Sequence, residues 1–262
     1  MNDATSNLPV PGLILHVVCG SRLYGTNTGG SDADEFAVFA EGPTQVLGLA
    51  PRTPHRVTRT AAAGARSAAG DVDACAYSLH KVLSLAMAGN PNALTPLFAA
   101  GDNILFATDV GDQLLALTPH VVSVHAARRL LAYGLDQRER LLGGGKRTNV
   151  PNRPELVAAH GYDTKYAAHA LRLPLQGLEL AATGRMSLPM PSADRDAVRA
   201  VRAGAVDLAG ALALIDDAVG RLNSVLCAWR PGVGPLPEQP DWEHVNAWLV
   251  GAYPRAWSAA TS

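Results

Sequence analysis

The periodicity of the apolar residues divides this chain of 262 residues into two parts, and the division limits the folds that it can adopt. Segments with the pattern of a β-strand all fall within the first 110 residues: the apolar, β-branched run 13–19, and 32–39 and 71–77. Beyond them, apolar residues recur at helical spacing over 79–87, 92–99, 113–117, 120–142, 154–183, 192–203, 207–229 and 242–250. Strands followed by helices are typical of the α+β class. We therefore predict a small sheet domain over residues 1–110 and a mostly helical domain over residues 111–262.

Composition excludes several classes of protein. The net charge of −1 argues against a protein that coats nucleic acid through overall basicity. The three cysteines, Cys19, Cys75 and Cys227, are far apart and odd in number, which fits neither a disulfide framework nor a zinc knuckle. No apolar run approaches the roughly 20 residues that span a bilayer. We expect a soluble, cytoplasmic protein with no membrane partner.

The charges are unevenly distributed along the chain. Residues 1–110 carry six basic and nine acidic side chains, whereas residues 128–185 carry ten basic and five acidic ones. An acidic first part and a basic middle are what an enzyme acting on metal-bound phosphates needs.

A pair of carboxylates begins the second predicted strand. Side chains at i and i+2 of a strand point to the same face, so Asp32 and Asp34 project together. Two neighbouring carboxylates repel each other unless a cation lies between them or one is protonated. Mg²⁺ takes oxygen ligands and keeps waters and substrate phosphates in its other positions. Asp71 and Asp73, on the next predicted strand, are both candidates for a third ligand, and Asp73 lies within the apolar alternation.

A Gly-Ser turn precedes this pair. Gly20 and Ser21 follow the first predicted strand and open a short helix. Backbone N–H groups at a helix start attract phosphate, and a glycine lets the phosphate approach closely. A lone Gly-Ser or Asp-x-Asp is usually a plain turn; the order strand, Gly-Ser, Asp-x-Asp and a further strand with Asp is far more specific.

These motifs together resemble the DNA polymerase β nucleotidyltransferase superfamily, and within it the bacterial and phage branch that includes RNA-ligase-associated polymerase β-like proteins. The resemblance rests on Gly20-Ser21 and Ser31 to Asp34, and continues through Asp73, Tyr77 to Lys81, Gly89 to Leu94, Gly161 to Lys165, His169, Arg172, Gly184-Arg185 and Leu188-Pro189. It implies a small mixed β-sheet core with helices. The chain departs from the family at Glu35 to Val38, where a small or basic residue and a glycine are expected.

The resemblance also implies an activity and its site. The family transfers a nucleoside monophosphate from an NTP to an acceptor with release of pyrophosphate, using two Mg²⁺ or Mn²⁺ ions. Asp32 and Asp34 would hold both ions, and Asp73 would complete the second ion's site and accept a proton. Gly20 and Ser21, with Arg22 beside them, would bind the triphosphate.

Basic residues of the second half supply further phosphate partners. A glycine-rich loop carries Lys146 and Arg147, and the following predicted helix presents Lys165, His169 and Arg172 at i, i+4 and i+7, on one face. Such a stripe is often only a solvated face. Because this helix is otherwise apolar and matches the family, we expect these five residues to bind phosphates of the NTP or the acceptor.

The leading hypothesis is therefore a two-metal nucleotidyltransferase whose acceptor is RNA, tRNA or another nucleic acid, which the basic segment 128–185 favours. Two alternatives remain. The chain could be a nucleotide- or RNA-binding module without catalysis, or a transferase that modifies a protein or a small molecule. The base of the NTP, the acceptor, the number of nucleotides added and the oligomeric state are not given by the sequence.

Overall fold

The computed structural model describes residues 8–29, 31–60, 71–144 and 153–259. The chain forms two compact units. The sheet unit comprises residues 1–122 and 240–262, and the helical unit comprises residues 123–239. In the sequence, the helical unit is therefore inserted into the sheet unit, between residues 122 and 240.

The sheet unit is built on a five-stranded mixed sheet with the strand order β3-β4-β2-β1-β5. Its strands are β1 (Leu13–Cys19), β2 (Ala33–Phe39), β3 (His55–Arg59), β4 (Val72–Ser78) and β5 (Ile104–Ala107). β2 and β4 run parallel, and the other three pairs are antiparallel. The α+β class and the mixed sheet that the sequence predicts are therefore confirmed.

Alternation along the three central strands places their side chains on two faces. The face on which Asp34 and Asp73 lie is called here the carboxylate face, and the apolar residues that share it are Leu15, Val17, Phe36 and Val38. These four side chains are buried. The opposite face buries Ala37, Phe39 and Ala76, which form a cluster with Val10. The sheet is covered on both faces at its centre, which explains why the central strands are nearly continuous in apolar residues.

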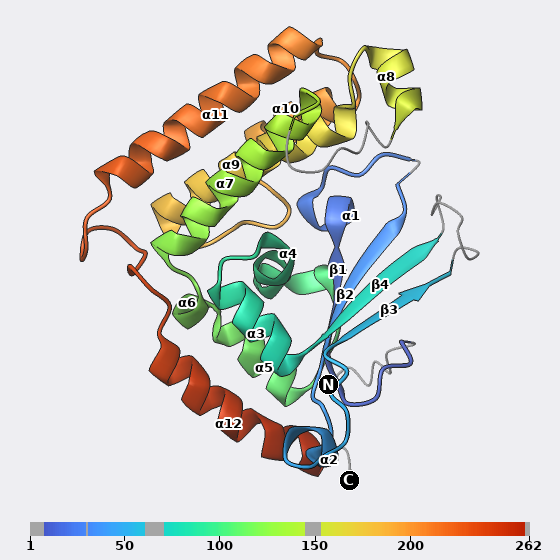
Figure 1. The fold of residues 1–262 in the computed structure, drawn as a ribbon, viewed down its shortest axis with the longest axis vertical. Helices are drawn as coiled ribbons and strands as arrows, with labels where there is room; N and C mark the ends of the chain where they lie inside the picture. The colour runs from blue at the N-terminus through green and yellow to red at the C-terminus, as the bar shows by residue number, and fades with distance from the viewer. Residues whose placement is uncertain (1–7, 30, 61–70, 145–152, 260–262) are drawn as a thin grey trace. The chain divides into compact units, whose positions relative to one another are not determined.

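Helices complete the sheet unit: α1 (Gly20–Tyr24), α2 (Pro43–Val46), α3 (Leu79–Met87), α4 (Pro91–Leu94), α5 (Asp109–Ala116), α6 (Thr118–Val121), α12 (Trp242–Ala259) and the 3₁₀ turns η1 (Thr95–Phe98) and η2 (Gly101–Asn103). As predicted, Ser78 caps α3, because its Oγ accepts a hydrogen bond from the backbone N–H of Lys81. α3 contacts β2 and β4, while α5 contacts β1 and β5 (Figure 1).

The C-terminal helix α12 is anchored on the sheet unit by a buried glutamate. Glu41 accepts hydrogen bonds from the Tyr253 hydroxyl at 3.0 Å and from Arg52 Nε at 2.9 Å. The indole N–H of Trp257 donates to the Glu41 carbonyl oxygen at 2.8 Å. The last helix therefore belongs to the sheet unit, although more than a hundred residues separate it from that unit's other elements.

The helical unit consists of α7 (Val124–Leu141), α8 (Pro154–His160), α9 (Thr164–Thr183), α10 (Ser192–Arg202) and α11 (Leu208–Ala228). α9 is its centre, since α7, α8, α10 and α11 all contact it. Gly177 allows α9 and α11 to pack closely, because a Cβ at this position would lie 2.5 Å from a methyl group of Leu222 on α11.

Several element boundaries differ from the sequence prediction. The single helix predicted over 154–183 is wrong: it divides at Gly161, which has a φ of +79°, and Asp163 caps the second helix. β3 and β5 were not expected at all. The last helix continues to Ala259, nine residues past the predicted end at 250. Within the described ranges, none of the helices is both long and apolar enough to cross a membrane.

Candidate active site

The Gly-Ser turn lies directly against the first carboxylate. β1 ends at Cys19 and α1 begins at Gly20, whose φ of +62° is in the left-handed region that favours glycine. A Cβ at this position would fall 2.0 Å from Asp34 Oδ2. The turn is held by Thr26, whose backbone N–H donates to the Ser21 carbonyl at 2.8 Å. The Gly-Ser turn and Asp34, which the sequence places ten residues apart or more, are thus neighbours in the structure.

Asp34 and Asp73 are brought side by side. They are direct partners in the parallel register of β2 and β4, so both side chains lie on the same face of the sheet. Cα atoms of neighbouring strands are about 5 Å apart, which places two carboxylates within reach of one cation. Asp32 lies one residue before β2, and its side chain is partly exposed.

Asp71 and Asp73 have different neighbours. The carboxylate of Asp71 accepts a hydrogen bond from the Thr60 hydroxyl at 3.1 Å, and its carbonyl oxygen accepts from the backbone N–H of Ala33 at 2.9 Å. Asp73 instead forms an ion pair with Arg59, at 3.6 Å between Nη2 and Oδ2. Asp71 thus ties the start of β2 to β4, whereas Asp73 faces Asp34.

The carboxylate oxygens at this site fit a divalent cation that keeps some of its coordination positions for water or substrate. Carboxylate oxygens are the ligands of Mg²⁺, which is commonly bound by one or two carboxylates together with waters and substrate phosphates. In the described part of the chain, the single group of three possible ligand residues whose atoms all lie within 4.8 Å of one another is elsewhere, at His120, Asp241 and His244. Asp32, Asp34 and Asp73 do not form such a closed group.

The sequence analysis assigned no role in the site to four residues near the carboxylates, although Tyr77 and Lys81 belong to the motifs that resemble the family. Cys75 and Tyr77 follow Asp73 at i+2 and i+4 on the carboxylate face, and His55 on β3 lies opposite Tyr77. The His55 Nε2 is 3.4 Å from Cys75 Sγ, and the Lys81 ammonium lies 4.3 Å above the Tyr77 ring. The alternation of residues 73, 75 and 77 could have indicated from the sequence that Cys75 and Tyr77 lie on the same face as Asp73.

Their protonation follows from this packing. Burial raises the pKa of the Cys75 thiol, and burial together with the charge of Lys81 lowers the pKa of His55. The pair is therefore a neutral thiol and a neutral imidazole at physiological pH, and not a thiolate nucleophile. Burial also raises the pKa of Tyr77.

The predicted basic stripe lies on α9 of the helical unit. Asp163 caps this helix by accepting from the backbone N–H groups of Lys165 and Tyr166, and it pairs with Arg153 at 3.4 Å. Lys165 is exposed in the first turn. Lys146 and Arg147, also predicted to bind phosphate, lie outside the described residues.

The other two members of the stripe are much less exposed. The Arg172 side chain is buried, donates through Nη1 to Gln176 Oε1, and donates through Nη2 to His169 Nδ1 at 2.9 Å. Burial, and then the charges of Arg172, Lys165 and Arg140, lower the pKa of His169 to about 3. His169 is therefore neutral at physiological pH, with Nδ1 as acceptor and the proton on Nε2. Of the three, Lys165 is the exposed cation.

Comparison with known proteins identifies the family of this chain. No curated protein matches this chain. A crystal structure of a nucleotidyltransferase-like protein from Exiguobacterium sibiricum 255-15 aligns with 83% of this chain and 70% of its own, at 12% identity and a TM-score of 0.29. The family model of RlaP, described as the RNA repair pathway DNA polymerase beta family, matches residues 4–209. The resemblance seen in the sequence motifs is thereby confirmed. Since the match spans most of the chain, the chain belongs to the RNA repair pathway DNA polymerase beta family, a family of polymerase β-like nucleotidyltransferases.

Proposed function

We propose that this chain transfers a nucleoside monophosphate from an NTP to an acceptor hydroxyl in a reaction that depends on a divalent metal. The observation that carries the proposal is the contact of Gly20 with the Asp34 carboxylate, together with the pairing of Asp34 and Asp73. A phosphate held at the Gly-Ser turn lies beside two carboxylates that can share a cation with it.

The chemistry is a substitution at the α-phosphorus. The acceptor oxygen forms a bond to this atom, the bond to the bridging oxygen of the β-phosphate breaks, and pyrophosphate leaves. Asp32, Asp34 and Asp73 would hold Mg²⁺ or Mn²⁺, which would lower the pKa of the acceptor hydroxyl and neutralise charge on the leaving group. Asp73 takes the hydroxyl proton, which its place opposite Asp34 favours over Asp71.

Basic side chains hold the phosphates. Backbone N–H groups of Gly20 and Ser21 bind the triphosphate, and the exposed Arg22 adds a positive charge. In the helical unit, Lys165 offers an exposed ammonium group to phosphate, while the neutral His169 offers an Nε2 proton. Arg172 orients His169. Lys146 and Arg147 complete this set.

We further propose that the acceptor is RNA. Two observations support it: the charge of +5 over residues 128–185, and the description of the matching family as belonging to an RNA repair pathway. A protein or a small-molecule acceptor would need no such basic segment.

The test is incubation of the full chain with each α-labelled NTP, Mg²⁺ or Mn²⁺, and total RNA, with protein and aminoglycoside mixtures as parallel acceptors. Label on RNA and release of pyrophosphate are expected. Asp34→Asn and Asp32→Ala should abolish both, whereas Asp102→Asn, a change at an exposed carboxylate in η2, should not. NTP binding without pyrophosphate release would show a binding module, and label on another acceptor would overturn the RNA assignment. Full activity of Asp34→Asn would refute the site.

A further inference from the structure

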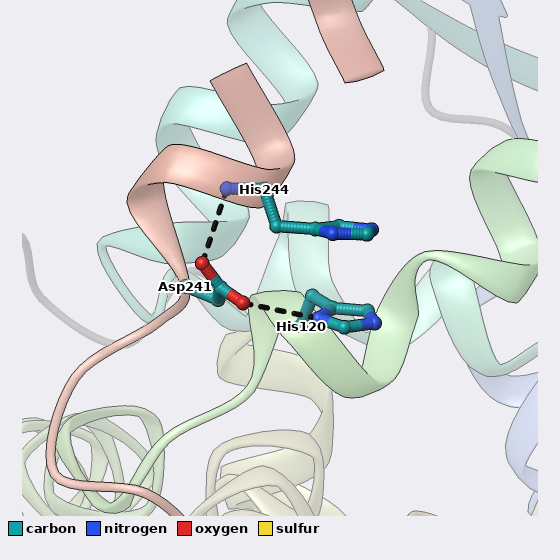
Figure 2. A group of neighbouring side chains, drawn as sticks. All are labelled: His120, Asp241 and His244. Carbon is teal, nitrogen blue, oxygen red and sulfur yellow. Dashed lines mark hydrogen bonds and ion pairs between the residues drawn. The ribbon is translucent and has the colours of Figure 1, made fainter. Parts of the chain in front are cut away.

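A second group of metal-ligand side chains lies in the sheet unit, formed by His120, Asp241 and His244. Figure 2 shows the carboxylate of Asp241 between the ring of His120 and the backbone of His244. Asp241 Oδ2 is 3.3 Å from His120 Nδ1, and Oδ1 accepts from the His244 backbone N–H at 3.1 Å. The two imidazole rings are stacked, with centroids 3.8 Å apart and planes 12° from parallel. One ligand atom from each residue lies within 4.8 Å of the others.

The position of this group in the chain is specific. His120 lies in α6, two residues before Val122, where the chain leaves the sheet unit. Asp241 directly precedes α12 and His244 lies in its first turn, just after Pro240, where the chain returns to the sheet unit. The backbone N–H of Asp241 donates to the His120 carbonyl at 2.9 Å. The group therefore connects the segment at which the chain leaves the sheet unit with the segment at which it enters this unit again.

Its chemistry differs from that of the carboxylate pair. Two imidazoles and one carboxylate suit Zn²⁺ and similar transition metals, whereas Mg²⁺ prefers oxygen alone. The side chains of His120 and Asp241 are 42% and 50% exposed, so an ion and its remaining water ligands have access.

A small movement would close the site. Ligand atoms around tetrahedral Zn²⁺ are about 3.3 Å apart, given metal–nitrogen distances of about 2.0 Å. The stacked rings must rotate to direct a nitrogen each toward one ion, and exposed side chains change rotamer within nanoseconds. The i, i+3 spacing of Asp241 and His244 keeps both on one side of α12 during this change.

We propose that His120, Asp241 and His244 bind one transition-metal ion of the Zn²⁺ class, and that this ion fastens the start of α12 to α6. The ion stabilises the pairing of the two chain segments between which the helical unit is inserted. This site is separate from the carboxylate pair and does not depend on the proposed transfer reaction.

The first experiment is titration of the tag-free, chelator-treated full chain with Zn²⁺ by calorimetry, and with Co²⁺ by visible absorption. One equivalent should bind, and Co²⁺ should give the absorption of a tetrahedral site. His120→Asn and His244→Asn should each weaken binding by more than tenfold, since losing a ligand costs at least as much as the roughly 10–100-fold for a supporting residue. His80→Asn, a change at an exposed histidine of α3, is the matched control and should bind as the unchanged chain does.

A second readout separates this site from the carboxylate pair and from scattered surface binding. Zn²⁺ should slow hydrogen exchange of the Asp241 amide in the unchanged chain and in Asp34→Asn, but not in His120→Asn. Equal Zn²⁺ binding by the unchanged chain and by both histidine variants would overturn the proposal. So would the loss of binding in Asp34→Asn, or no stoichiometric binding at all.

Discussion

Gly20 leaves no room for a side chain beside Asp34: a Cβ would approach the Asp34 Oδ2, Cγ and Cβ atoms to 2.0, 2.7 and 2.8 Å. Gly20→Ala should therefore displace this carboxylate as well as strain the backbone. We expect a fall in nucleotidyl transfer of about 100-fold, the effect of moving a catalytic group by about 1 Å. The strain at positive φ should lower the free energy of unfolding by about 1–2 kcal/mol.

Gly101→Ala is the matched control for the strain alone. Gly101 has a φ of +57°, close to that of Gly20, but a Cβ there would meet no atom within 4 Å. This variant should show a comparable loss of stability in urea unfolding with transfer activity unchanged. If Gly20→Ala were as active as Gly101→Ala, the Gly-Ser turn would not position Asp34 for the reaction.

Asp71, directly before β4, and Asp73, within β4, should differ in function. Asp73→Asn removes a carboxylate opposite Asp34, so we expect transfer to fall at least 100-fold, a rough figure for loss of a positioned acid–base group. Asp71→Asn weakens the bond from Thr60 and should lower stability by about 1 kcal/mol, with activity retained within a few-fold. Initial rates of pyrophosphate release and urea unfolding measure both effects. The reverse order of activities would make Asp71 the third ligand.

The central strands and the carboxylates could be predicted from the sequence because each of these strands has a local pattern. β1 and β2 each contain four consecutive buried residues, β4 alternates between buried and partly exposed residues, and Asp34 and Asp73 lie within these strands. β3 has no such pattern. It is an edge strand of the described sheet that pairs with β4, and its basic residues are mostly exposed. Its place, and that of Arg59 beside Asp73, depend on tertiary pairing.

The helical stripe shows a different limit. The spacing of Lys165, His169 and Arg172 defines a face of a helix, but not what covers that face. Because α9 is packed by its neighbours, Arg172 is buried and bonded within its own helix, and of these three residues only Lys165 is exposed. Helical periodicity also could not indicate that Gly161 and Asp163 end one helix and begin the next.

Glu41 should make the anchoring of α12 dependent on pH. Its hydrogen bond from Arg52 lowers its pKa below 4.5 in the folded state. The contribution of Glu41 to the free energy of unfolding is then complete above its pKa in the unfolded chain. It is lost as the pH falls through its lowered pKa in the folded chain. Glu41→Gln should cost about 2 kcal/mol at pH 7, typical of hydrogen bonds to a charged group, and less at pH 3. Urea unfolding at both pH values tests this.

Glu238→Gln, at an exposed glutamate, is the control for a change of charge alone and should match the unchanged chain at both pH values. A cost for Glu41→Gln that is the same at pH 3 as at pH 7 would mean that the Glu41 carboxylate does not titrate below 4.5.

His169 should remain neutral in the folded chain well below the pH at which a free histidine ionises. Its side chain is partly buried, its ring accepts a hydrogen bond from the buried Arg172, and its pKa is about 3 against 6.5 for the free side chain. The unfolded chain therefore takes up this proton first, so the free energy of unfolding should decline as the pH falls from about 6.5 toward 3. NMR titration of the ring should show no shift down to pH 5.

His169→Gln tests the same arrangement from the other side. The glutamine oxygen can still accept from Arg172 but cannot titrate, so stability should depend less steeply on pH between 6.5 and 4 than in the unchanged chain. Transfer activity should be kept within about tenfold if His169 serves only as a neutral donor to phosphate, since a lost neutral hydrogen bond is worth about 1 kcal/mol. A ring that titrates near pH 6.5, with equal slopes for the two proteins, would show a charged His169 and restore it as a cation of the basic stripe.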